Sequence, residues 1–301
     1  MRTETRMNGR KGKISRKKFW KEVRWWGIIF FLAAVLAIVL RVFLFSSFKV
    51  PSYSMFPTIE GGDYIFVNKQ IPGPRIFPHF PKVRMDGKVV TKRFRGIREI
   101  RRNDVIVFNF PYADRGKIDM DLNVHYIKRC VAIPGDTFYI ENGIYRVKNA
   151  HGETLGYVEY QQQMSRKPED EYRNNCVFPH DSAHYRWTLR DFGPLYVPKK
   201  GDRLQIDTIN YLLYRNLITY ETDKPVTVNG GNVYLGDSVI RGYTFLMNYY
   251  FMAGDYIFNS IDSRYWGLVP EDHVIGKAVI IWKSKDMGTG KYRWKRFFRI
   301  L

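Results

Sequence analysis

The stretch 25–69, WWGIIFFLAAVLAIVLRVFLFSSFKVPSYSMFPTIEGGDYIFVNK, combines three features that decide the fold. It begins with an apolar segment, continues through a short loop that contains serine and proline, and ends in a strand pattern. The apolar segment carries no charge before Arg41 and extends beyond it to about 21 residues, the length that crosses a hydrocarbon core of about 30 Å. Arg41 lies near the far end, where a long side chain can reach the headgroups. The sequence therefore predicts a transmembrane helix at residues 25–47 that leads directly into a β domain.

The basic residues before this segment predict its orientation. Ten Lys or Arg residues and only two acidic residues lie within positions 1–24. By the positive-inside rule, positions 1–24 are a cytoplasmic segment and the chain beyond the span lies outside the cytoplasmic (inner) membrane. The alternative is a cleaved signal peptide, but FSSFKV at positions 45–50 offers no Ala-x-Ala-like cleavage site. A retained single-pass anchor is therefore the favoured interpretation.

The formal net charge of +20 raises the question of an acidic partner. Much of the excess lies just before the span, and no nucleic-acid-binding motif accompanies it. This distribution predicts a lipid bilayer with anionic headgroups as a partner, and no nucleic acid. The six histidines lack HExxH or similar spacing, so no metal site is expected. The two cysteines, Cys130 and Cys176, are compatible either with a disulfide outside the cytoplasm or with free thiols.

The chain beyond the span has the pattern of a mainly β protein. Apolar and alternating runs predict strands at Asp63–Lys69, Asp104–Phe110, Tyr126–Ile133, Tyr256–Phe258 and Val274–Lys283. Between the predicted strands Tyr126–Ile133 and Tyr256–Phe258 lies a polar, Tyr-rich stretch with weak strand patterns and one helix-like run from Asp207 to Thr219. We therefore expect an antiparallel β core formed by 48–137 and 251–301, with a β-rich subdomain inserted at 138–250.

Ser54, in the loop after the span, is a candidate nucleophile that needs a base. The histidines form no recognisable Ser/His/Asp pattern, so lysine is the other candidate. Lys128 lies in a predicted strand, on the same face as Tyr126 and Cys130, where burial would lower the pKa of its amine. The alternative is an edge-strand lysine that discourages aggregation. Spacing alone leaves both interpretations open.

Four sequence blocks, taken together, resemble the type I signal peptidases, a family of Ser/Lys membrane proteases. Any one block alone would be weak, but all four follow the family's order behind an anchor. They are Ser52-x-Ser54-Met55-x-Pro57-Thr58 with Gly62-Asp63, Asp104–Phe108, Tyr126–Arg129 with Pro134-Gly135-Asp136, and Gly254-Asp255 with Asn259-Ser260-x-Asp262-Ser263-Arg264-Tyr265-Trp266-Gly267.

The resemblance implies a role for each matching residue. Ser54 is expected to be the nucleophile and Lys128, held neutral, its general base. The backbone N–H of Ser54 and the hydroxyl of Ser52 are expected to form the oxyanion hole. Ser260 is expected to hydrogen-bond the lysine, while Asp262 and Arg264 are expected to form a supporting ion pair. Met55 is expected either to contact substrate or simply to pack.

The sequence departs from the family pattern in two places. Ala132 stands where the family usually has Gly, and Tyr256-Ile257 replaces the usual Asn-Arg after Gly254-Asp255. Neither change touches the expected nucleophile or base, so activity is still expected. The departures affect only the local packing and the details of the substrate pocket.

The expected function is hydrolysis of exported preproteins after small residues at the −1 and −3 positions, with no metal or cofactor. Six residues separate Phe48 from Ser54, so even an extended chain keeps the serine within about 20 Å of the end of the span. Two alternatives stand beside this interpretation. One is another Ser/Lys peptidase, such as a relative of the self-cleaving repressors, and the other is a non-catalytic, anchored envelope-assembly or binding protein.

Overall fold

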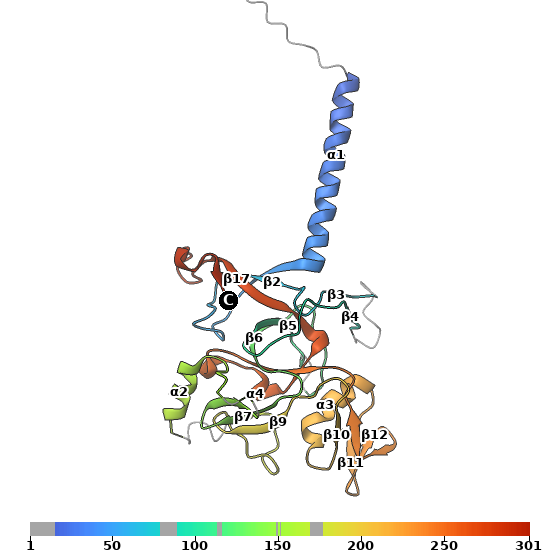
Figure 1. Cartoon of the computed structure of the whole chain (residues 1–301), viewed down its shortest axis with the longest axis vertical. Helices are drawn as coiled ribbons and strands as arrows, with labels where there is room; N and C mark the ends of the chain where they lie inside the picture. The colour runs from blue at the N-terminus through green and yellow to red at the C-terminus, as the bar shows by residue number, and fades with distance from the viewer. Residues whose placement is uncertain (1–15, 79–88, 113–115, 149, 151, 169–176) are drawn as a thin grey trace, which may run out of the picture. The chain divides into compact units, whose positions relative to one another are not determined.

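The computed structural model describes residues 16–78, 89–112, 116–148, 150, 152–168 and 177–301 (Figure 1). They fall into two compact units, Met1–Val42 and Phe43–Leu301. The first unit contains helix α1 (Arg16–Val39), which a π-helical segment, η1 (Leu40–Leu44), continues. Among the described residues, Phe19–Leu44 is the one helix long and apolar enough to cross a membrane, with a mean hydropathy of 2.8. This helix overlaps the span predicted at residues 25–47, although residues 45–47 lie in a strand.

The second unit is built on one antiparallel sheet of eight strands. Its order is β1-β2-β17-β5-β6-β15-β16, with β18 paired to β17. The strands are β1 (Phe45–Lys49), β2 (Asp63–Asn68), β5 (Val105–Asn109), β6 (His125–Ala132), β15 (Tyr249–Ala253), β16 (Val269–Pro270), β17 (Val274–Ser284) and β18 (Arg299–Ile300). The last long strand therefore lies between strands from the first half of the chain. The predicted fold class, mainly antiparallel β after an apolar helix, is confirmed.

Strand β5 shows why the sequence VIVFN forms a central strand. All five of its residues are buried. Val105 and Val107 belong to one hydrophobic core, and Ile106 and Phe108 belong to another. Successive side chains of a strand point to opposite faces, so a strand buried on both faces is apolar except where a polar side chain is hydrogen-bonded, as Asn109 is to Arg75 (2.7 Å). Both faces of β5 are thus covered by hydrophobic cores.

The chain between β6 and β15 forms smaller sheets and two helices. They are β7 (Thr137–Glu141), β8 (Ile144–Val147) and β9 (Phe192–Tyr196), then β10 (Arg203–Gln205) with β14 (Gly242–Thr244), then β11 (Val226–Asn229), β12 (Asn232–Leu235) and β13 (Ser238–Ile240), with helices α2 (Val158–Arg166) and α3 (Tyr211–Thr222). Phe138 and Phe192 of this region share a core with Phe251 of β15, and Phe138 lies 4.3 Å from Phe251 between ring centroids. This region therefore packs directly against the main sheet.

Two predicted elements differ from the structure. The strand predicted at Tyr256–Phe258 is wrong: a 3-10 turn, η3 (Ile257–Asn259), stands there, and strand β15 ends at Ala253. The backbone N–H of Tyr256 donates to the carbonyl of Ser54 (3.1 Å) instead of to a strand ladder. The predicted helix begins at Tyr211, because the Asp207 carboxylate accepts from the N–H groups of the next turn. Helix α2 was not predicted.

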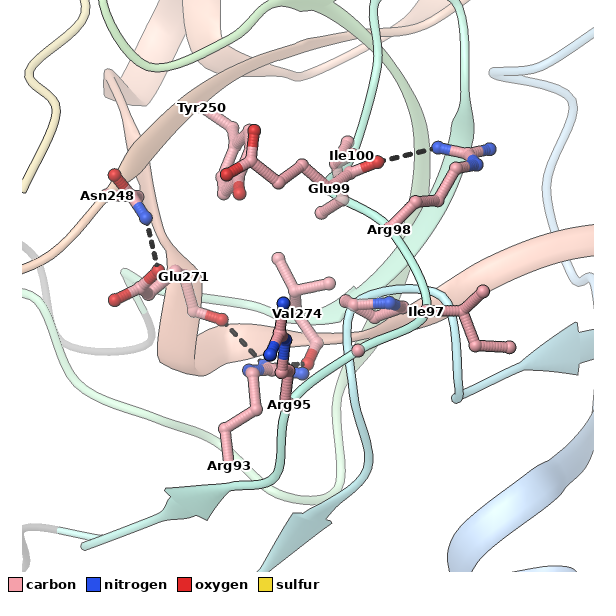
Figure 2. A pocket seen from close by; sticks show the side chains of 12 residues that line it. Arg93, Arg95, Ile97, Arg98, Glu99, Ile100, Asn248, Tyr250, Glu271 and Val274 are labelled. Carbon is pink, nitrogen blue, oxygen red and sulfur yellow. Dashed lines mark hydrogen bonds between the residues drawn. The ribbon is translucent and has the colours of Figure 1, made fainter.

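A short hairpin, β3 (Arg75–Ile76) with β4 (Lys92–Arg93), inserts two arginines beside the start of β17. Arg93 donates to the carbonyls of Glu271 (2.7 Å) and Val274 (2.5 Å), and Arg75 donates to the carbonyl of Asp272 (2.5 Å). An adjacent cavity has a volume of about 320 Å³. Arg93 and Glu271 are among the residues that line it (Figure 2). These partly buried guanidinium groups hold the turn η4 (Glu271–His273) in place.

The described residues include one of the two cysteines, Cys130, and its thiol is free. Cys130 of β6 is fully buried, and its thiol lies 3.4 Å from the carbonyl oxygen of Ala132. Cys176 lies outside the described residues.

Candidate active site

The loop between β1 and β2 presents Ser54 and is held at both ends. The N–H of Val50 donates to the carbonyl of Asp63 (2.8 Å), and the N–H of Gly62 donates back to the carbonyl of Val50 (2.7 Å). Inside the loop, the Met55 side chain is 1% exposed and packs in the core that contains Val50. The burial of Met55 supports packing rather than substrate contact as its role in this state.

Lys128 of β6 contacts Ser54, although β17 and β5 lie between β6 and β2 in the sheet. Its Nζ donates to Ser54 Oγ at 2.6 Å, and both side chains are almost completely buried (4% and 7% exposed). Nζ also lies 5.4 Å from the ring centroid of Tyr126, as expected for side chains on one face of the strand. The structure thus brings the two predicted residues into direct contact.

Burial sets the protonation of Lys128. Removal from water lowers the pKa of its amine from 10.5 to about 8, and the nearby Arg264 adds to this, against the opposing effects of Asp262 and Asp255. An amine with a pKa near 8 is neutral in a substantial fraction of molecules at mildly alkaline pH, whereas an exposed lysine is not. Lys128 can therefore accept a proton from the hydroxyl that it contacts.

Ser52 lies beside the same hydroxyl. Its Oγ is 3.5 Å from Ser54 Oγ, with either oxygen able to donate, and its side chain is exposed. A hydroxyl in this position can point toward a group that approaches Ser54 from solvent. The structure therefore brings the hydroxyls of Ser52 and Ser54 and the amine of Lys128 close together.

Asp262 organises the residues behind the lysine. Its buried carboxylate accepts from the Ser260 hydroxyl (2.7 Å), the Gly254 N–H (2.9 Å) and the Arg264 guanidinium (2.8 Å). Burial alone would raise the pKa of Asp262, but the Arg264 charge and these hydrogen bonds outweigh it and hold the pKa below its usual value. The expected ion pair is present at the N-terminus of the short helix α4 (Ser263–Trp266).

The hydrogen bond expected between Ser260 and Lys128 differs from what the structure shows. In the described part of the chain, the Ser260 hydroxyl donates to Asp262, and the Lys128 amine donates to Ser54. The nearby carboxylate of Asp262 is the stronger acceptor for a hydroxyl, since it is charged and fully buried. Ser260 therefore contacts the network behind the lysine.

Gly254 is the point at which these segments approach most closely. A Cβ at this position would lie 2.1 Å from Ser260 Oγ and 2.6 Å from the Ser54 carbonyl oxygen. No side chain fits without moving one of these groups. Close packing against both Ser54 and Ser260 explains why the position must be glycine.

The structure contains a second ion-pair network, and its contacts were not predicted from the sequence. Arg129 donates to both carboxylate oxygens of Asp255 (2.7 and 2.6 Å), and the Thr58 hydroxyl donates to Asp255 at 2.5 Å. The three residues come from the serine loop, from β6 and from the segment after β15. Each lies within a block that carries the family resemblance, so a signal was present. The network ties together the three segments that supply the candidate site.

The C-terminal segment clamps the other end of the serine loop. Arg296 donates to Asp63 (2.6 Å) and Glu60 (2.8 Å), and Arg293 donates to Glu60 (2.7 Å). Asp63 is fully buried and also accepts from the Ser284 hydroxyl at 2.6 Å. The sequence showed only a run of basic residues here, which gave no indication of these partners.

Within the described residues, no group of three or more His, Cys, Asp or Glu side chains is placed to hold a metal ion.

A buried serine hydroxyl in contact with a lysine of lowered pKa provides the groups that a serine hydrolase with a lysine base requires. The sequence pattern of the family described as "Signal peptidase, peptidase S26" matches residues 23–283. The chain belongs to this family and is a serine endopeptidase.

Individual relatives agree with this assignment. Signal peptidase I of Pseudomonas aeruginosa is 30% identical over 282 residues, which cover 86% of this chain and 72% of that protein. Signal peptidase I of Haemophilus influenzae is 28% identical over 89% of this chain and 73% of its own length. Signal peptidase I of Aquifex aeolicus is 26% identical over 84% of this chain and 82% of its own length. The similarity therefore extends through the β domain.

Proposed function

We propose that this protein removes signal peptides from exported preproteins by means of a dyad of Ser54 and Lys128. The observation that carries the proposal is the 2.6 Å contact between two buried side chains, one of them a lysine whose pKa is lowered to about 8. A buried lysine gains nothing structurally from losing its hydration, whereas a general base requires a neutral amine. Membership of the signal peptidase family supports the choice of substrate.

The proposed reaction proceeds in two halves. Ser54 Oγ attacks the scissile carbonyl carbon while Lys128 Nζ takes the hydroxyl proton, and the lysine then gives this proton to the leaving amine as the C–N bond breaks. The Lys128 amine then deprotonates a water molecule, which attacks the carbonyl carbon of the resulting ester. The ester bond breaks, and the lysine returns the proton to Ser54 Oγ. The Ser54 N–H and the Ser52 hydroxyl stabilise the oxyanion that forms in each half. The 3.5 Å separation of the two serine oxygens supports this role for Ser52.

The remaining site residues act by positioning. We place Ser260, Asp262 and Arg264 in a network that fixes the segment behind Lys128, since Asp262 receives hydrogen bonds from both of the other side chains. Ser260 then acts through Asp262 rather than by direct contact with the amine. Met55, which is buried, supports the serine loop from below.

We also propose a topology. Residues 25–47 anchor the chain in the cytoplasmic membrane, residues 1–24 lie in the cytoplasm, and the catalytic core (48–137 and 251–301) with its insert (138–250) lies outside. The apolar helix Phe19–Leu44 and the basic segment before it support this arrangement. Anionic headgroups are the expected partners of the basic segment.

The function is tested with the full chain solubilised in detergent. Incubation with a preprotein should release a product whose new N-terminus follows small residues at −1 and −3, and Ser54→Ala should abolish release. Binding of the preprotein without cleavage by the wild type would favour the anchored binding protein instead. Release by Ser54→Ala would exclude Ser54 as the nucleophile.

The topology is tested on intact spheroplasts, with the two native cysteines replaced by serine. A single cysteine at the exposed position Gly288 should react with a membrane-impermeant maleimide, and a cysteine at Thr3 should react only after lysis. The opposite pattern would contradict the proposed orientation.

A further inference from the structure

A row of aromatic side chains begins beside the candidate nucleophile and runs onto helix α2. We define this aromatic row as Phe56, Tyr256, Tyr160 and Tyr157. Successive ring centroids are 6.1, 4.9 and 5.2 Å apart. Phe258 flanks it, 6.1 Å from Tyr160 and 6.2 Å from Tyr256. These separations are those of aromatic rings in mutual contact.

The row is tied directly to the serine loop. Phe56 stands two residues after Ser54, and the Tyr256 N–H donates to the Ser54 carbonyl at 3.1 Å. None of its rings is fully buried, although each contacts its neighbours. The row therefore offers an apolar surface that begins at the nucleophile.

Helix α2 holds the outer half of the row in a fixed position. Gln161 of this helix is buried, donates to the Leu155 carbonyl (2.5 Å) and accepts from the Tyr145 N–H (2.9 Å). Met164 on the same helix is 1% exposed. Tyr157, at the N-cap, and Tyr160 are three residues apart and share one helix face. The rings are thus ordered before any ligand arrives, which lowers the entropic cost of binding.

Two sequence features place this surface outside the matching residues of the four blocks. Tyr256 stands where the family usually has Asn, and helix α2 lies in the inserted region, outside the four blocks of family resemblance. The ring contact of 4.9 Å between Tyr160 and Tyr256 joins these two features. A surface built from both is not explained by the cleavage chemistry alone.

We propose that the aromatic row binds the preprotein residues that follow the scissile bond and favours apolar or aromatic side chains there. The proposal rests on the proposed function. Small residues before the cut require shallow, closed pockets, whereas an open row of rings gives a broad surface that suits larger side chains. Because an extended chain advances about 3.3 Å per residue, the row can span at most about five substrate residues. Stacking and apolar burial supply the selectivity.

The test compares two preproteins that differ only after the cut. One carries Phe or Tyr at the second to fourth residues of the mature part, and the other carries Ala at these positions. The wild-type full chain in detergent should cleave the aromatic substrate with a kcat/KM roughly threefold to tenfold higher, mainly through KM. Tyr160→Ala should bring this ratio close to one, while Tyr160→Phe, which keeps the ring, should preserve it. Tyr256→Asn should also lower the ratio.

The matched control is Tyr211→Ala, at the start of α3. This tyrosine is also partly buried and packs against the same core as Tyr160. Its substitution should leave the wild-type ratio intact. Equal cleavage of both substrates by the wild type, or an unchanged ratio in Tyr160→Ala, would overturn the inference.

The side of the scissile bond is tested with aromatic residues moved to positions before the cut. If Tyr160→Ala altered selectivity there and not after the cut, the assignment of the row would be wrong. Any of these failures, with cleavage still dependent on Ser54, would leave the proposed function standing. Cleavage by Ser54→Ala would remove the proposed function itself.

Discussion

Lys128 Nζ lies 2.6 Å from Ser54 Oγ, although 74 residues separate the two in the chain. Ser54 comes from a loop whose ends are pinned between β1 and β2, and Lys128 comes from the middle of β6. The two segments are joined a second time by Arg129, whose guanidinium reaches Asp255 and, at 3.3 Å, Thr58. The contact is therefore fixed by the sheet and by an ion-pair network, and not by local sequence.

The first prediction concerns the pH dependence of cleavage. Lys128 must be neutral to accept the serine proton, and its pKa is lowered to about 8. Activity should therefore fall about tenfold for each pH unit below that value and reach a plateau above it. Initial rates of preprotein cleavage between pH 6 and pH 10 measure this. A rate that stayed level down to pH 6 would contradict a lysine base with this pKa.

The second prediction concerns the stability that Lys128 costs the fold. Its folded pKa lies below the unfolded value near 10.5, so the unfolded state binds more protons between about pH 8 and pH 10.5. The cost is fully present below pH 8 and disappears as the pH rises from about 8 to about 10.5. Lys128→Met should abolish cleavage yet increase the free energy of unfolding at pH 7, by an amount on the order of 3 kcal/mol.

Urea unfolding of the full chain in detergent at pH 7 and pH 10.5 measures this difference. The gain should be clearly smaller at the higher pH. A variant less stable than the wild type at pH 7 would show that Lys128 contributes net stability.

The third prediction concerns Gly254. In Gly254→Ala the new Cβ would lie 2.1 Å from Ser260 Oγ and 2.6 Å from the Ser54 carbonyl oxygen, so the nucleophile must shift. A displacement of this kind should lower kcat/KM about 100-fold. Gly288→Ala is the matched control, because its Cβ would meet only Asp286 at 3.6 Å. Equal activity in the two variants would show that the close approach at Gly254 has no effect on the reaction.

The fourth prediction concerns the buried ion pair. Asp262→Ala leaves the fully buried guanidinium of Arg264 without its carboxylate and should destabilise the chain by about 3–5 kcal/mol. The exposed pair of Arg146 and Glu141 provides the comparison, since Glu141→Ala should change stability by less than about 1 kcal/mol. Thermal unfolding measures both. Similar losses in the two variants would mean that Asp262 has no special structural role.

The candidate site could be predicted from the sequence because its residues lie in short blocks that resemble one family. Ser54, Lys128, Ser260 and Asp262 all lie in such blocks, and the structure brings them together. Pairing details could not be predicted in the same way. Ser260 donates to Asp262 because a charged, buried carboxylate is a strong acceptor, and nothing in the sequence spacing distinguishes this acceptor from the lysine.

The fold could be predicted from the sequence where burial of apolar side chains determines the local structure. The first four residues of strand β5, Val105–Phe108, are all apolar because cores cover both faces of the strand. The prediction failed at Tyr256–Phe258, where apolar residues form a 3-10 turn, since Tyr256 N–H is used to hold the serine loop. Helix α2 was not predicted because one of its two buried residues, Gln161, is polar. Gln161 is buried because it forms two hydrogen bonds inside the protein, and these partners cannot be read from the sequence.

The central claim, that Ser54 and Lys128 act as one catalytic unit, is tested most directly by the cleavage rates of Ser54→Ala, Lys128→Ala and the double variant. These rates are measured on one preprotein with the solubilised full chain. Each single substitution should lower kcat by about 10⁴-fold or more, and the double substitution should lower it no further, because residues that act as a unit are not additive. A single variant that kept a tenth of the wild-type rate, or losses that multiplied in the double variant, would contradict the dyad.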